Sequence, residues 1–257
     1  MARRPGFPVR LDGPAAAPAG GTRRSAASLG PAGHDRPDGI GLDSQAVRTR
    51  MVQRLAAHGV TDAQVLAAMG AVERHRFVDT ALVNQAYEET SLPIGLGQTI
   101  SKPNVVARMI ELLRGGAKGP DGRLGRVLEV GTGCGYQAAV LSRLACEVYS
   151  IERLRGLHEK ARDKLRYFRL PNVHLLFGDG MAGYPKGAPY AGIIAAAGGE
   201  AVPPAWIEQL AVGGRIVAPM LMPDGRQALL MIEKTAREMK QTVLEPVHFV
   251  PLKSGIA

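Results

Sequence analysis

The chain has 257 residues, of which 46% are hydrophobic, and 32 Lys and Arg against 23 Asp and Glu give it a formal net charge of +9. This composition suits one or two globular domains with a sizeable core. No apolar run approaches the roughly 18 residues that a membrane-spanning helix needs, so a membrane-spanning protein is excluded. The two cysteines, Cys134 and Cys146, argue against a disulfide scaffold or a cysteine-ligated zinc site and favour a reducing compartment, here the cytoplasm.

The positive charge favours anionic partners, which include acidic substrates as well as nucleic acids. Aromatic residues make up only 5% of the chain, which is a small number for a surface that stacks on bases. Nucleic acid is therefore a less favoured partner than an acidic substrate.

Residues 1–44 differ in composition from the rest of the chain. Ala, Gly, Pro, Arg and Ser dominate there, and large apolar residues are scarce. Such a segment cannot bury enough apolar surface to offset the entropy lost on ordering. It also lacks the continuous apolar stretch of a secretory signal peptide. We expect a disordered tail, with an organelle transit peptide as the weaker alternative, followed by a single domain over residues 45–257.

The first part of this domain, residues 45–116, is predicted to be a helical preface that ends in a loop and a further helix. Apolar residues four apart between 47 and 55 indicate an amphipathic helix. Thr61 or Asp62 can cap a second helix. Two glycines and two prolines in residues 92–103 predict a loop. The helix after that loop is expected to end where two glycines follow each other.

The second part, residues 117–257, alternates short apolar runs with longer helical patterns, which is typical of an α/β fold. The first five strands are separated by lengths that fit crossover helices, and the last two by a shorter connection. These lengths predict a doubly wound, mostly parallel, Rossmann-like sheet of about seven strands, with helices on both faces and an antiparallel hairpin at one edge. The predicted strands are residues 126–130, 148–151, 173–177, 192–196, 216–219, 228–233 and 243–250.

The first of these strands runs directly into a glycine-rich turn, V-L-E-V-G-T-G-C-G-Y. Glycines let a backbone turn tightly and approach a ligand closely. A dinucleotide fingerprint, G-x-G-x-x-G, would need a glycine where the chain has Tyr136. The spacing E-x-G-x-G-x-G instead resembles the first motif of S-adenosylmethionine-dependent methyltransferases, and an ordinary glycine-rich turn is the alternative. The resemblance implies a cofactor site made of the loop residues Gly131, Thr132, Gly133 and Gly135. It also assigns Glu129 to the cofactor, as an acid that adds negative charge near the sulfonium.

Two acidic residues at strand ends extend the predicted cofactor site. Glu152 follows Gly131 by about 20 residues, and a carboxylate there can accept both hydroxyls of a ribose. Asp179 is in a position to accept a hydrogen bond from the adenine amino group, so Glu152, Asp179 and the adjacent Gly180 are assigned to the cofactor. The alternatives are a solvated strand-end acid for Glu152 and a turn-forming Asp-Gly pair for Asp179.

Taken together, several segments resemble the protein-L-isoaspartate O-methyltransferase family; they are residues 92–101, 127–137, 150–153, 178–180 and 249–252. The most specific element is G-Q-T-I-S-x-P at residues 97–103, since the glycine-rich loop is common to many methyltransferases. The resemblance covers about residues 47–257. It implies a methyltransferase domain that transfers a methyl group from S-adenosylmethionine to the α-carboxyl of L-isoaspartyl residues in damaged proteins, leaving S-adenosylhomocysteine. The expected enzyme is a monomer without a metal.

The resemblance identifies Ser101 as the active-site serine and places Thr99 and Ile100 in the same substrate site. By residue type alone, Ser101 is also a good N-cap for the helix that follows Pro103. A carboxylate nucleophile has a pKa near about 4 and is ionised at neutral pH, so the reaction needs no general base. The absence of an obvious catalytic His or Cys therefore agrees with this chemistry.

Two departures from the family pattern keep other functions open. Ala191 stands where the family usually has Asp, and Gly198-Gly199 replaces an Ala/Pro pair near the expected site. One alternative is a methyltransferase with another target, such as RNA, a small molecule or a biosynthetic peptide. The other is a cofactor-binding module of the same fold that has lost turnover.

Overall fold

The computed structural model describes residues 45–257, and the tail expected over residues 1–44 lies outside the described residues. The described part opens with a helical preface made of α1 (Gln45–Ala57), α2 (Ala63–Ala71) and two 3-10 helices, η1 (Arg74–Phe77) and η2 (Thr80–Gln85). Asp62 caps α2, because its carboxylate accepts hydrogen bonds from the backbone N–H groups of Gln64 (2.9 Å) and Val65 (3.1 Å). This confirms the predicted start of the second helix.

A β-hairpin occupies most of the segment that was expected to be a loop. β1 (Leu92–Gly95) pairs antiparallel with β2 (Gln98–Ile100). The turn between them has positive φ at Gly95 (97°), Leu96 (52°) and Gly97 (68°), a backbone region that glycine enters at little cost. The loop prediction was wrong because the glycines form the turn of a hairpin instead of interrupting regular structure. The predicted third helix is α3 (Pro103–Arg114), and it ends before Gly115 as expected.

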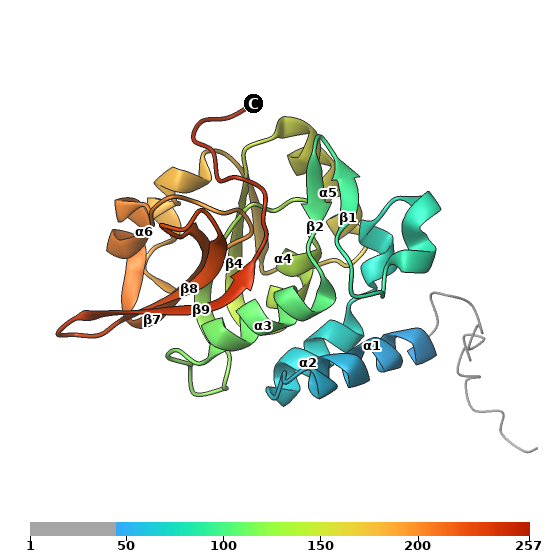
Figure 1. Ribbon diagram of the computed structural model, residues 1–257, viewed down its shortest axis with the longest axis horizontal. Helices are drawn as coiled ribbons and strands as arrows, with labels where there is room; N and C mark the ends of the chain where they lie inside the picture. Colours follow the sequence, from blue (N-terminus) through green and yellow to red (C-terminus); the bar gives the residue numbers. More distant parts are fainter. Residues whose placement is uncertain (1–44) are drawn as a thin grey trace, which may run out of the picture. The chain divides into compact units, whose positions relative to one another are not determined.

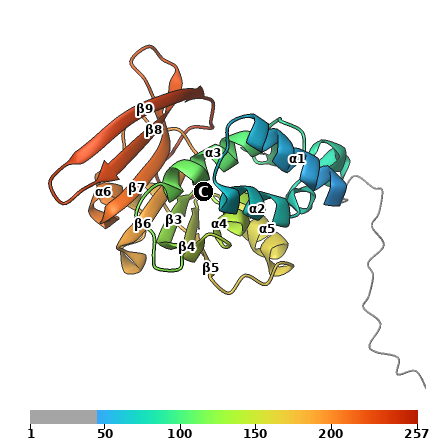
Figure 2. The same ribbon diagram turned by 90° about the horizontal axis from the view of Figure 1, so that it is seen from below.

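Seven strands form the main sheet in the order β5-β4-β3-β6-β7-β8-β9 (Figures 1 and 2). The first five strands of the sheet in chain order are parallel, and β8 is antiparallel to both of its neighbours. This confirms the doubly wound, mostly parallel fold with an antiparallel edge. The strands are β3 (Leu124–Val130), β4 (Ala145–Glu152), β5 (Val173–Phe177), β6 (Tyr190–Ala195), β7 (Leu210–Leu221), β8 (Gln227–Lys234) and β9 (Met239–Val247).

The two faces of the sheet are covered by different helices. Because side chains alternate along a strand, Val127 packs in one buried cluster with residues of the preface, α3 and α4 (Tyr136–Leu141), and Leu128 packs in the other with Trp206. Trp206 belongs to α6 (Pro204–Gln209), and its side chain is fully buried. α5 (Arg155–Arg166) adds Leu165 to the first cluster. The sheet is therefore buried between two apolar layers.

The connection from β5 to β6 differs from the prediction of a crossover helix. It contains only two short 3-10 helices, η3 (Gly180–Ala182) and η4 (Pro185–Gly187). Glycines and prolines recur throughout residues 178–189, and both residue types disfavour a helix interior. The last predicted strand is also shifted, because β9 ends at Val247 and the residues after it run along the cavity described below.

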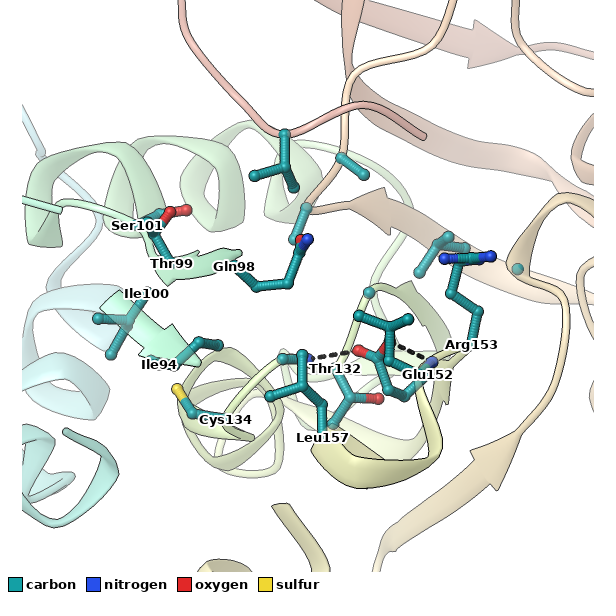
Figure 3. A pocket seen from close by; sticks show the side chains of 18 of the residues that line it. Ile94, Gln98, Thr99, Ile100, Ser101, Thr132, Cys134, Glu152, Arg153 and Leu157 are labelled. Atoms are coloured by element: carbon teal, nitrogen blue, oxygen red, sulfur yellow. Dashed lines mark hydrogen bonds between the residues drawn. The ribbon is translucent and has the colours of Figure 1, made fainter. Parts of the chain in front are cut away.

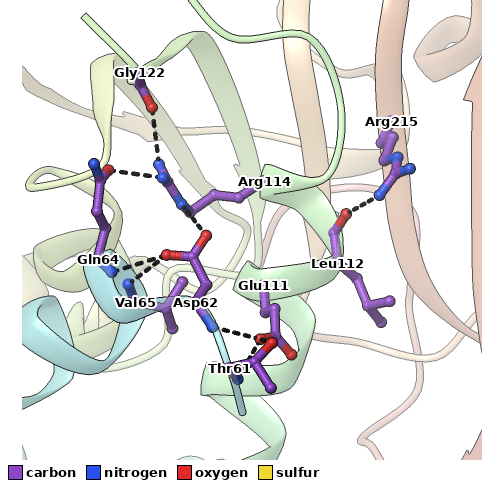
Figure 4. A network of polar contacts seen from close by, with 9 residues as sticks. All are labelled: Thr61, Asp62, Gln64, Val65, Glu111, Leu112, Arg114, Gly122 and Arg215. Atoms are coloured by element: carbon purple, nitrogen blue, oxygen red, sulfur yellow. Dashed lines mark hydrogen bonds and ion pairs between the residues drawn. The ribbon is translucent and has the colours of Figure 1, made fainter.

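A network of polar contacts fastens the preface to α3 (Figure 4). The buried guanidinium of Arg114 donates to Asp62 Oδ2 (2.9 Å) and Gln64 Oε1 (2.7 Å). Glu111, one turn earlier on α3, accepts from the backbone N–H of Thr61 (2.6 Å) and of Asp62 (2.8 Å). Every charge in this network faces an opposite charge or a hydrogen-bonding partner, which is the condition under which buried ionic groups are tolerated.

Within residues 45–257, none of the helices combines the length and the apolar character that crossing a lipid bilayer requires.

Candidate active site

A cavity of about 470 Å³ lies at the carboxyl ends of the parallel strands, where ligands bind in open α/β sheets (Figure 3). Its volume is within the range of roughly 300–1,000 Å³ that is usual for small-molecule sites. Two walls face each other across it: the hairpin wall (residues 94–101) and the glycine-loop wall (residues 130–137 and 151–154). The C-terminal segment (residues 248–257) contributes residues 250–253 to the lining.

The glycines of the loop adopt the left-handed backbone conformations that make a tight turn possible. Gly131 (φ 92°), Gly133 (φ 57°) and Gly135 (φ 92°) all have positive φ. Gly131, Gly133 and the intervening Thr132 line the cavity, whereas Gly135 does not. A Cβ atom at Gly135 would lie 2.9 Å from Leu165 Cδ1, so this glycine permits close packing of the loop against α5. Gly135 thus makes a packing contact in the structure, and its expected contact with the cofactor stays a prediction.

Glu152 is held in the glycine-loop wall by two backbone groups. Its Oε2 accepts from the N–H of Gly133 and its Oε1 accepts from the N–H of Leu154, both at 2.9 Å, and Figure 3 shows both contacts as dashed lines. The residue is 4% exposed and lines the cavity. Since each carboxylate oxygen can accept more than one hydrogen bond, Glu152 retains capacity for two hydroxyl donors and is not a solvated strand-end acid.

Only one residue of the Asp179–Gly180 pair lines the cavity. Gly180 lines the cavity, and a Cβ atom there would lie 2.4 Å from Val130 Cγ1. Asp179 does not line it, because its carboxylate accepts from the N–H of Met181 (2.8 Å) and of Gly255 (2.7 Å). Asp179 therefore stabilises the turn and also contacts the C-terminal segment, which the sequence did not indicate, and its expected contact with the adenine amino group stays a prediction.

Glu129 lies behind the glycine loop and does not reach the cavity. Its Oε2 accepts a hydrogen bond from the Ser150 hydroxyl, which is 2.6 Å from the hydroxyl oxygen of Thr132. Complete burial raises the pKa of Glu129 to about 8, although the hydrogen bond from Ser150 opposes this rise. Burial therefore favours the neutral form of this carboxyl group, and the negative charge expected near the sulfonium stays a prediction. Its contact with the loop runs through Ser150 to Thr132.

The hairpin wall presents the predicted substrate residues to the cavity. Thr99, Ile100 and Ser101 all line it, and so does Gln98 (Figure 3). The N-cap of α3 is Lys102, whose side chain makes no capping hydrogen bond; the N–H of Asn104 in the first turn donates to the Glu89 carboxylate instead (3.1 and 3.2 Å). Ser101 is therefore not the N-cap that its residue type suggested. The backbone carbonyl of Ser101 accepts a hydrogen bond from Arg74 Nη2 at 2.7 Å.

The two departures from the family pattern lie in different places. Ala191 is in the first half of β6, away from the carboxyl ends of the strands. Gly198 bonds the C-terminal segment: its N–H donates to Val250 O and its carbonyl accepts from Leu252 N–H, both at 2.8 Å. A Cβ atom at Gly198 would lie 2.5 Å from the side-chain amide of Gln227, which also hydrogen-bonds the segment. Gly198 therefore makes room for the C-terminal lining of the cavity.

Sequence reasoning missed two features of this site. The C-terminal segment contributed to the family resemblance, but it was not assigned to the cavity that it lines. Arg74 could not be identified from the sequence, since a single arginine in a helical segment belongs to no motif. In residues 45–257, no group of three or more His, Cys, Asp and Glu side chains is placed to hold a metal ion.

The geometry combines a loop that accepts close backbone contact, a carboxylate suited to a ribose, and a polar hairpin facing them. Comparison with known proteins agrees with this arrangement. The family model described as protein-L-isoaspartate(D-aspartate) O-methyltransferase matches residues 46–257. A protein-L-isoaspartate O-methyltransferase of Methylibium petroleiphilum is 56% identical over 98% of this chain and 96% of its own length. One of Leptothrix cholodnii is 57% identical over 84% of this chain and 77% of its own.

Solved structures give the same result for the fold. A structure named protein-L-isoaspartate O-methyltransferase superposes with a TM-score of 0.72 at 29% identity, over 81% of this chain and 67% of that one. A Plasmodium falciparum structure of the same description, in complex with S-adenosyl-L-homocysteine, has a TM-score of 0.66 at 21% identity, over 80% of this chain and 98% of that one. At this lower identity, the similarity concerns the fold alone.

Proposed function

The chain belongs to the protein-L-isoaspartate O-methyltransferase family, and we propose that the cavity between the hairpin and the glycine loop is its active site. The protein transfers a methyl group from S-adenosylmethionine to the α-carboxyl of L-isoaspartyl residues, leaving a methyl ester and S-adenosylhomocysteine. One observation supports this site above the others: the glycine loop with Glu152 and the hairpin with Ser101 line the same cavity.

The residues of the glycine-loop wall fit the cofactor. Gly131 and Gly133 have positive φ and no Cβ atom, so a ligand can approach their backbone closely. Gly180 likewise has no side chain that would contact Val130. Glu152 accepts the two ribose hydroxyls, since its oxygens are fixed but not saturated by backbone N–H groups. When bound, the sulfonium of the cofactor supplies an activated methyl group and a neutral leaving group.

The hairpin wall positions the nucleophile. The isoaspartyl carboxylate arrives ionised, so no residue has to remove a proton, and the protein contributes orientation. Ser101 donates its hydroxyl hydrogen to the carboxylate or to the adjoining substrate backbone, with Thr99 and Ile100 shaping the space beside it. Holding reactants in line in this way can lower a barrier by roughly 7–11 kcal/mol. Apolar lining residues such as Ile94 and Leu157 exclude water from the reacting groups.

We further propose that the protein acts as a cytoplasmic monomer on isoaspartyl-containing proteins and peptides. Cys134 and Cys146 are both free thiols, as is typical of proteins in reducing compartments. Burial raises the pKa of the Cys134 thiol, which keeps this cavity-lining group protonated and unreactive. Size-exclusion chromatography with light scattering measures the oligomeric state, and a mass of twice the chain would contradict the monomer.

The function is tested with one peptide synthesised in isoaspartyl and normal aspartyl forms and with labelled S-adenosylmethionine. We expect base-labile methyl incorporation into the isoaspartyl form only. Incorporation into RNA, or into both peptide forms equally, would contradict the assignment. Binding of S-adenosylhomocysteine without methyl transfer would instead identify a cofactor-binding module that has lost turnover.

A further inference from the structure

Arg74, in the helical preface, is a buried arginine that is bonded to the active-site hairpin. Its side chain is completely inaccessible to solvent. Nε donates to the carbonyl of Ala86 and Nη2 to the carbonyl of Ser101, both at 2.7 Å. The guanidinium carbon lies 4.8 Å from the centre of the Tyr136 ring. Among the described residues, no carboxylate lies within 4.0 Å of it as an ion-pair partner.

This placement is unfavourable for folding taken alone. A buried cation loses its hydration, and without an ion pair at contact distance the loss is recovered through hydrogen bonds, the face of an aromatic ring and the more distant charge of Glu89. In agreement with this, desolvation lowers the pKa of Arg74. Arg114, the other buried arginine of the described residues, has Asp62 as a partner at 2.9 Å. Burying Arg74 therefore costs more folding free energy than burying Arg114, which has an ion-pair partner.

The contacts of Arg74 join the two walls of the cavity. The Ser101 carbonyl belongs to the residue that ends the hairpin wall. Tyr136 is the first residue of α4 and directly follows Gly135 at the end of the glycine loop. Both Ser101 and Tyr136 line the cavity, whereas Arg74 does not. One rigid guanidinium thus fixes the backbone of Ser101 against the helix that carries the glycine loop.

We propose that Arg74 is a positioning residue for methyl transfer. Its planar fork sets the position of the Ser101 backbone, and through it the hydroxyl that orients the substrate carboxylate, relative to the methyl donor. A misplacement of about 1 Å is enough to lower the rate of a reaction that depends on orientation by about 100-fold. This inference rests on the proposed function, because Ser101 must lie on the substrate side of an active methyltransferase.

Two substitutions test the geometry separately from the charge. Arg74→Lys keeps the positive charge but lacks the fork that reaches both carbonyls, and Arg74→Met fills a similar volume without a charge. We expect kcat for an isoaspartyl peptide to fall by about 30- to 100-fold in both variants. The Kd for S-adenosylhomocysteine should change by less than about threefold, because the cofactor residues themselves are untouched. A purely structural role would not produce this separation of kcat from Kd.

The matched control is Arg114→Lys, which alters an equally buried arginine that binds Asp62 and Gln64 away from the cavity. Its melting temperature should fall, while kcat per folded molecule stays within about twofold of wild type. Saturating S-adenosylhomocysteine in the unfolding measurement shows which variants are folded, since a bound ligand stabilises only the native state. Arg74→Met removes the buried charge together with the hydrogen bonds to Ala86 and Ser101, so the melting temperatures of both Arg74 variants are measured before kcat is interpreted.

Wild-type kcat in Arg74→Lys, or an equal loss of kcat in Arg114→Lys, would overturn the proposal. A wild-type protein that transfers no methyl group to isoaspartyl peptide would contradict the proposed function instead. The two failures are therefore distinguishable.

Discussion

The two walls of the cavity are held in place by different means. In the glycine-loop wall, Glu152 and the loop are fixed by backbone hydrogen bonds and by the register of adjacent parallel strands. The hairpin wall belongs to a separate two-stranded sheet and is tied to the rest of the site by the side chain of Arg74. From this difference we expect cofactor binding to depend on the local fold and turnover to depend on contacts between distant segments.

The largest effect is expected from Glu152→Ala, which removes the acceptor from the glycine-loop wall. Two hydrogen bonds to a charged group contribute about 1.5–3 kcal/mol each, so the Kd for S-adenosylhomocysteine should rise by about 100-fold or more. Isothermal titration calorimetry measures the change. Glu159→Gln, on the exposed side of α5, is the matched control and should leave the Kd unchanged. An unaltered Kd in Glu152→Ala would mean that the cofactor lies elsewhere.

A smaller effect is expected from Ser101→Ala, which alters only the hairpin wall. We expect kcat to fall by about 10- to 30-fold, the loss of one hydrogen bond to a charged group, without a change in cofactor Kd. The melting temperature should stay within about 1 °C of wild type, since Ser101 does not cap α3. Ser91→Ala, at an exposed position just before β1, is the control. A drop in melting temperature with unchanged turnover would show that Ser101 has a structural role alone.

The raised pKa of Glu129, which lies behind the glycine loop, can be tested through the pH dependence of stability. Its carboxyl group has an ordinary pKa of 4.5 when unfolded and about 8 in the fold. The native state therefore holds a proton that the unfolded chain releases, and the stability from this group is lost as the pH rises from about 4.5 through about 8. Glu129→Gln does not titrate, so its melting temperature relative to wild type should increase between pH 6 and pH 9. A difference that is the same at every pH would contradict the raised pKa.

The smallest effect is expected from deletion of residues 1–44. The composition of this segment predicts no packed core, and the family model matches from residue 46. We therefore expect kcat and KM for the isoaspartyl peptide to stay within about twofold of the full chain. A large loss of activity in a folded truncated protein would show that the segment contributes to the site.

Much of the glycine-loop wall could be predicted from the sequence because its signals are local. A strand, a glycine-rich turn and a helix follow one another within residues 124–141, and Glu152 ends the strand next to it. The mostly parallel sheet was predicted from the lengths of the connections between the apolar runs of residues 117–257. The role of Gly135 was less predictable, because positive φ is a local property but the neighbour that excludes a Cβ atom, Leu165, comes from another helix.

The sequence by itself determined the fold class, the location of the glycine loop, the position of Glu152 at the end of a strand, and the location of the segment that carries Ser101. Only the tertiary structure decided that Arg74 donates to the Ser101 carbonyl 27 residues away, that Asp179 accepts from a backbone N–H 76 residues away, and that burial raises the pKa of Glu129. Backbone conformation and apolar periodicity depend on residues that are close together in the sequence. The burial of a charge and the partner of a side chain depend on which distant segments the folded chain brings together.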